Sequence, residues 1–173
     1  MKKIALTCAL FGLLASQSLF AQSCASPTSL QSSTATGDTC TGANLVSGVE
    51  CGFTPYTGKQ VAFSFSPTAG FTATAITLTN SSANGTWTPR MFLQTGGTCG
   101  DSNDCNGGSV VAGDSNQNTT VTLTFGAGGA TLPTAGGGPY YLIVQANNAA
   151  QCGQFGLTAN GTFPVKLQSF NIQ

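Results

Sequence analysis

The chain has 173 residues, of which only 6% are charged, and its formal net charge is zero. It contains no histidine, which excludes Ser-His-Asp and Cys-His catalysis and removes the commonest transition-metal ligand. Its basic residues are too few to form the Lys/Arg clusters that displace counterions from phosphates, so nucleic-acid binding is excluded as well. We therefore expect a protein that is not an enzyme and needs no cofactor.

Residues 1–21 have the pattern of a bacterial secretory signal peptide. Two lysines form a charged start, Ile4–Leu14 is apolar, and Leu19–Ala21 ends in a small-residue cleavage site. The apolar run is shorter than the roughly 20 residues that a transmembrane anchor needs. We expect cleavage after this segment, export to the extracellular space or the cell surface, and a single domain over residues 22–173 without a transmembrane anchor.

Six of the seven cysteines remain after the expected cleavage, because Cys8 lies inside the signal peptide. An even number in an exported chain predicts a disulfide framework. The six are Cys24, Cys40, Cys51, Cys99, Cys105 and Cys152. Short polar segments favour local bridges from Cys40 to Cys51 and from Cys99 to Cys105, which leaves Cys24 for Cys152. Lipidation of Cys24 and metal binding by thiolates are the alternatives, and the absence of CxxC pairs and histidine disfavours metal binding.

Alternating apolar and polar residues predict a series of half-buried strands. Val61–Phe65 alternates cleanly, and Phe71–Leu78 does so with a change of phase at Ala75 that predicts a β-bulge. Further strands are expected at Trp87–Gln94, Val110–Val111, Thr119–Phe125, Tyr140–Ala146, Phe155–Ala159 and Phe163–Ile172. Tyr140–Ala146 is apolar on both faces, which predicts a central position in its sheet.

Clusters of Gly, Asn, Asp and Pro separate these segments at the spacing expected of turns in a sandwich or barrel. No segment after the signal peptide combines a sustained helical period with a cap. The sequence therefore predicts an all-β fold, with about eight strands in two antiparallel sheets that form a disulfide-stapled, jelly-roll-like β-sandwich.

Four segments, taken in order, resemble those of bacterial pre-peptidase C-terminal domains. They are the opening Gly37–Phe65, the strand ending in Met91–Leu93, the strand Gly138–Val144 and the strand Cys152–Thr158. Lys59 and Phe63 stand where that family commonly has Asp and Tyr. The resemblance implies a jelly-roll-like sandwich without catalytic residues. In that family the domain is usually an appendage of secreted peptidases and other hydrolases, whereas here we expect it to stand alone.

Two groups of residues are candidates for ligand binding. Trp87 and Tyr56 carry rings that could stack on sugars, although a core position is the favoured interpretation for Trp87. Asp101, Asn103 and Asp104 offer oxygen ligands for Ca²⁺. Their spacing does not match an EF-hand, and a solvated turn is the favoured interpretation.

The last strand-like segment, Phe163–Ile172, has two interpretations. It can be an edge strand of its own sandwich, or it can complete the sheet of a second copy. We expect a non-enzymatic secreted or cell-surface protein that acts in adhesion or extracellular assembly, with itself, a glycan or a cell-surface protein as the partner. The alternative is a carbohydrate- or protein-binding accessory module of a secreted hydrolytic system.

Overall fold

The computed structural model describes residues 27–30, 32–43, 57–82, 87–95, 111–112, 120–126 and 133–163. Within these ranges the chain forms nine strands and one short 3-10 helix, η1 (Thr39–Thr41). The strands are β1 (Thr28–Ser29), β2 (Thr34–Asp38), β3 (Gln60–Phe65), β4 (Ala75–Asn80), β5 (Pro89–Thr95), β6 (Val111–Ala112), β7 (Thr120–Thr124), β8 (Tyr140–Ala146) and β9 (Gln154–Asn160). No helix in these ranges is long and apolar enough to cross a membrane.

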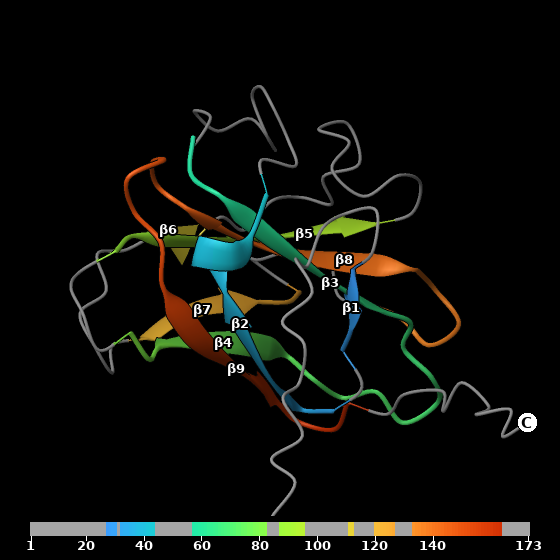
Figure 1. Cartoon of the computed structure of the whole chain (residues 1–173). Coiled ribbons are helices and arrows are strands. Elements are labelled where there is room, and N and C mark those ends of the chain that lie inside the picture. The colour runs from blue at the N-terminus through green and yellow to red at the C-terminus, as the bar shows by residue number, and fades with distance from the viewer. Residues whose placement is uncertain are drawn as a thin grey trace, which may run out of the picture.

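The strands form two layers (Figure 1). One sheet has the order β1-β3-β8-β5-β6 and the other has the order β2-β9-β4-β7. All pairs are antiparallel except β1 with β3. If β1 is set aside, the eight strands from β2 to β9 occupy the two sheets in the order of a jelly roll. The predicted all-β, jelly-roll-like sandwich is therefore confirmed, and so is the central position of β8.

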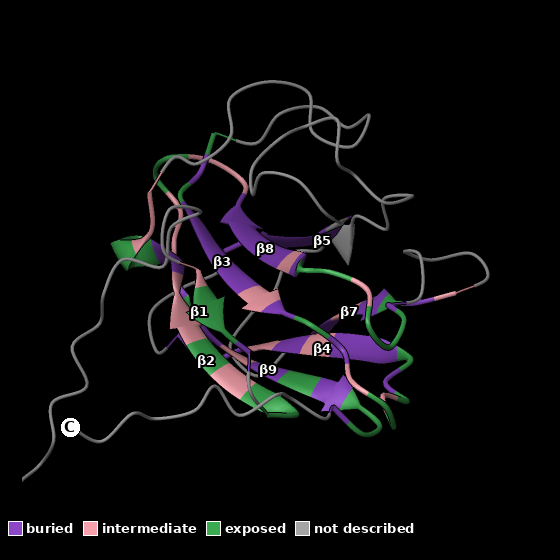
Figure 2. Ribbon diagram, turned by 90° about the vertical axis from the view of Figure 1, so that its right-hand side faces the viewer, coloured by how far each residue is buried: buried purple, intermediate pink, exposed green. Residues whose placement is uncertain are grey.

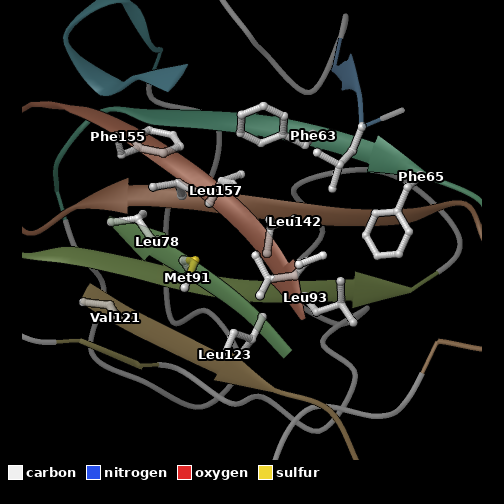
Figure 3. Close-up of a cluster of buried hydrophobic side chains, with 14 of the residues drawn as sticks. Phe63, Phe65, Leu78, Met91, Leu93, Val121, Leu123, Leu142, Phe155 and Leu157 are labelled. Atoms are coloured by element: carbon white, nitrogen blue, oxygen red, sulfur yellow. The ribbon is translucent and has the colours of Figure 1, made fainter. Parts of the chain in front are cut away.

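Side chains that point inward from the two sheets form one continuous core between the layers (Figure 3). The labelled members are Phe63, Phe65, Met91, Leu93 and Leu142 from the five-stranded sheet and Leu78, Val121, Leu123, Phe155 and Leu157 from the four-stranded sheet. Phe63 and Phe155 meet edge to face, with ring centroids 6.2 Å apart. This contact joins the two layers directly, because each ring comes from a different sheet.

Strand β4 begins at Ala75, four residues later than the alternation predicts, and a bulge precedes its regular part. The Thr74 N–H donates to the Asn160 carbonyl at 3.0 Å, while Ala75 is the register partner of the same residue. Two residues therefore lie opposite one, which is the arrangement of a β-bulge. The buried positions change phase from Ala73 to Ile76 across it, so the predicted change of phase is confirmed.

A disulfide joins Cys40 to Cys152, with Cα atoms 4.8 Å apart. The predictions that Cys40 pairs with Cys51 and that Cys24 pairs with Cys152 are therefore wrong. The reason is the register of β2 on β9, since extending it two residues beyond Asp38 places Cys40 opposite Cys152. The remaining cysteines, Cys24, Cys51, Cys99 and Cys105, lie outside the described residues.

Candidate functional site

Trp87 lies in the core and does not present a ring to solvent. Its side chain is 1% exposed, and its ring centroid is 6.1 Å from that of Phe155. A buried ring has no face on which a sugar could stack, so the core interpretation of Trp87 is confirmed. Tyr56, the other aromatic candidate, lies outside the described residues.

The acidic loop proposed for Ca²⁺ also lies outside the described residues, because Asp101, Asn103 and Asp104 fall in the range 96–110. Within the described ranges, no three His, Cys, Asp or Glu side chains gather at one place. Two charged side chains, Asp38 and Lys59, bind main-chain groups near η1. Asp38 Oδ1 accepts the Cys40 N–H at 2.8 Å, and Lys59 Nζ donates to the Cys40 carbonyl at 3.0 Å. These contacts fix local structure and do not form a catalytic pair.

A shallow pocket of about 270 Å³ lies beside the loop that precedes β8. It is lined by Ser66, Pro67, Thr68 and the segment Gly136–Pro139. This lining has no titratable side chain, and the volume is below the range of roughly 300–1,000 Å³ that is typical of small-molecule sites. The pocket therefore offers neither a titratable side chain nor the volume of an ordinary ligand site.

The two sheets differ in how far their outer faces are accessible. Strands β3, β5 and β8 are buried along most of their length, whereas β4 and β9 mix buried and accessible residues and β2 has no buried residue (Figure 2). The buried outward residues of the five-stranded sheet include Gln60, Ala62, Arg90, Phe92, Ile143 and Gln145. Among the described residues, the accessible outer face is therefore that of the four-stranded sheet.

That accessible surface is covered by threonines that lie in register across all four strands. One row consists of Thr34 on β2, Thr158 on β9, Thr77 on β4 and Thr122 on β7. The next row consists of Thr36, Gly156, Thr79 and Thr120 in the same strand order. We call these two rows the threonine face. Neighbouring strands lie about 4.8 Å apart and alternate residues about 6.8 Å apart, so the hydroxyl and methyl groups form a two-dimensional array.

The threonine face is electrically neutral. Its side chains are exposed or half-buried, and neither row contains a charged residue. The hydroxyl oxygens of Thr77 and Thr122 lie 3.0 Å apart and share a hydrogen bond across β4 and β7. Such cross-strand bonds hold neighbouring side chains in fixed positions. The face thus presents ordered hydroxyl and methyl groups without charge or aromatic rings.

The threonine face was not predicted from the sequence, although part of its signal is visible there. Threonines alternate within Thr34–Thr36, Thr77–Thr79 and Thr120–Thr124. Each short repeat alone indicates only a polar face on one strand. The order and register of the strands are needed to place the repeats beside one another.

No family model, no curated protein and no solved structure matches the chain. The resemblance to pre-peptidase C-terminal domains therefore stays a prediction.

Proposed function

We propose that this protein is a non-enzymatic, secreted or cell-surface β-sandwich that acts in adhesion or extracellular assembly. The threonine face is the single observation that carries the proposal. A polar strand face ordinarily carries a mixture of charged and polar side chains. Here two rows of four strand positions hold seven threonines and one glycine, in register.

The chemistry of the threonine face favours a neutral, hydroxyl-rich partner. With no charge in either row, the seven threonines offer no salt bridge to an ionic ligand, and the nearest described charge on this side of the sheet is Asp38, in the row beside Thr36. Each threonine instead offers a hydroxyl that donates and accepts hydrogen bonds and a methyl group that packs against apolar surface. The surface of a neutral polysaccharide presents the same two kinds of group, as sugar hydroxyls and C–H groups.

Because the two rows contain no aromatic ring, they favour the extended surface of a polysaccharide as the partner over a single sugar chain. Aromatic stacking is a strong anchor for an isolated sugar ring, and the threonine face does not supply it. Individual contacts by hydroxyl groups are weak after their loss of water is counted, at about 0.5–1.5 kcal/mol each. A flat array gains binding strength by making many such contacts at once, which requires an extended partner surface.

Retention on insoluble polysaccharides tests this proposal. The wild-type protein is expected to bind cellulose or chitin particles more strongly than carboxymethyl-cellulose, which is charged. Thr158→Arg should lower retention about tenfold, because a long charged side chain in the centre of the face prevents close approach and loses water on binding. Thr28→Arg is the matched control, since Thr28 is an exposed strand residue on the other sheet.

The proposal requires that the two arginine variants behave differently. Thr28→Arg should be retained like the wild type. If the wild type is retained on neither neutral polymer, or if Thr158→Arg is retained as well as Thr28→Arg, the threonine face is not an adhesive surface.

A further inference from the structure

The two end strands of the four-stranded sheet, β2 and β7, differ in how their outer edges are protected. An end strand directs half of its main-chain N–H and carbonyl groups away from the sheet, where another strand can pair with them. Proteins usually block such edges with charges, prolines, bulges or local hydrogen bonds. The edge that lacks such protection is the one that can accept a strand of another chain.

The register identifies the outward groups of β2. The Ala159 N–H donates to the Ser33 carbonyl at 2.7 Å, and the Thr39 N–H donates to the Gly153 carbonyl at 3.0 Å. Because bonding direction alternates along an antiparallel strand, odd-numbered residues of β2 face β9. The outward residues are therefore Thr34, Thr36 and Asp38.

Local contacts block most of the β2 edge. The Ser32 hydroxyl donates to the Thr34 carbonyl and accepts the Thr34 N–H. At the other end, the Thr41 hydroxyl donates to the Asp38 carbonyl at 2.9 Å. The carboxylate of Asp38 also adds a charge to this edge. A second strand would have to displace these contacts before it could pair with β2, so the β2 edge is blocked.

The β7 edge carries none of these protections within the described residues. The Phe125 N–H donates to the Thr74 carbonyl at 2.8 Å, so odd-numbered residues of β7 face β4. The outward residues are therefore Thr120, Thr122 and Thr124. No described residue bonds to their main-chain groups, and the strand contains no charge, proline or bulge. Strand β6 of the other layer approaches β7 but does not pair with it.

We infer that β7 pairs with β7 of a second copy of this chain, in antiparallel orientation about a two-fold axis at Thr122. The edge is complementary to itself, because this axis places Thr122 opposite its own copy and Thr120 opposite Thr124. Three outward residues from each copy can then form about six main-chain hydrogen bonds. Threonines directly opposite one another are a favourable cross-strand pair, and no like charges meet at the axis.

Pairing through β7 would also extend the threonine face. The row Thr34, Thr158, Thr77 and Thr122 would continue into the same row of the second copy in reverse order. The two faces would form one array across an eight-stranded sheet. Two linked binding surfaces bind a shared partner with higher avidity and need no new kind of contact. The inferred pairing would therefore strengthen the proposed adhesion, and its biological role rests on that proposed function.

Sedimentation equilibrium of the purified mature protein tests the pairing. The wild type should reach twice the monomer mass in a reversible, concentration-dependent manner. Thr122→Pro should remain at the monomer mass, because proline removes an outward N–H at the axis but leaves the β4 ladder intact. Thr36→Pro is the matched control, because it removes an outward N–H from the blocked β2 edge. This variant should still dimerise.

A second variant covers the case in which the proline substitution prevents folding. Thr122→Lys places two like charges opposite each other at the axis and should also give a monomer, with the far-ultraviolet circular dichroism of the wild type. A monomeric wild type at millimolar concentration, or a Thr122→Lys protein that dimerises like the wild type, overturns the inference. A monomeric wild type that is still retained on cellulose overturns only the pairing, and a dimeric wild type that is not retained overturns only the adhesive function.

Discussion

Replacing Phe155 with alanine is expected to lower the free energy of unfolding by about 3–5 kcal/mol, the usual cost of removing a buried aromatic ring. The side chain of Phe155 is 1% exposed and lies between Phe63 of the other sheet and Trp87. It also fills the space beside Gly37, where a Cβ atom would lie only 2.4 Å from the Phe155 Cζ atom. Removing the ring therefore leaves a cavity that touches both layers.

Urea unfolding measures this effect, with the fluorescence of Trp87, the single tryptophan, as the signal. Thr158→Ala is a suitable control, because it changes an exposed residue of the same strand and should cost less than about 1 kcal/mol. If Phe155→Ala costs no more than this control, Phe155 is not the residue that joins the two layers.

Replacing both Cys40 and Cys152 with serine is expected to lower the free energy of unfolding by about 2–5 kcal/mol. The bridge joins residues that are 112 positions apart, so its loss frees a long loop in the unfolded chain. The fold should persist, because the Gly153 N–H still donates to Thr39 Oγ1 at 2.9 Å and the ladder of β2 with β9 continues from there.

The thermal unfolding midpoint and the urea midpoint both report this loss. The double variant leaves no free thiol from this pair to exchange with the other cysteines, so the comparison with the wild type isolates the bridge. Circular dichroism of the folded variant should keep the strand signal. An unchanged midpoint would show that Cys40 and Cys152 are not joined in the folded protein.

Alternation predicts the strands that carry large apolar residues. Strands β3, β7 and β9 place residues such as Phe63, Leu123 and Leu157 inward at every second position, and this period is visible without the structure. Strand β2 was missed because its inward residues are Ala35 and Gly37, which give no hydrophobic signal. Gly37 is small because the ring of Phe155 occupies the space where its side chain would lie.

Features that depend on register were not predictable from the sequence. The spacing of Cys40 and Cys51 favours a local bridge, but the ladder of β2 with β9 brings Cys152 to Cys40 instead. The threonine face has the same origin, because its rows join strands that are distant in sequence. The burial of Trp87, by contrast, agrees with the core position that the sequence favours, and only its contact with Phe155 of a distant strand needs the structure.

The proposed contact between the threonine face and a neutral polymer is tested most directly by nuclear magnetic resonance of threonine methyl groups. In a transferred cross-saturation experiment, irradiation of the C–H protons of added cellulose nanocrystals should weaken the signals of the face in deuterated protein with protonated threonine methyls. These are the signals of Thr34, Thr36, Thr77, Thr79, Thr120, Thr122 and Thr158. Thr39, which is fully buried, and Thr28, which lies on the other sheet, should keep their signals. Uniform weakening of all threonine signals, or a loss confined to threonines outside the face, would contradict the account.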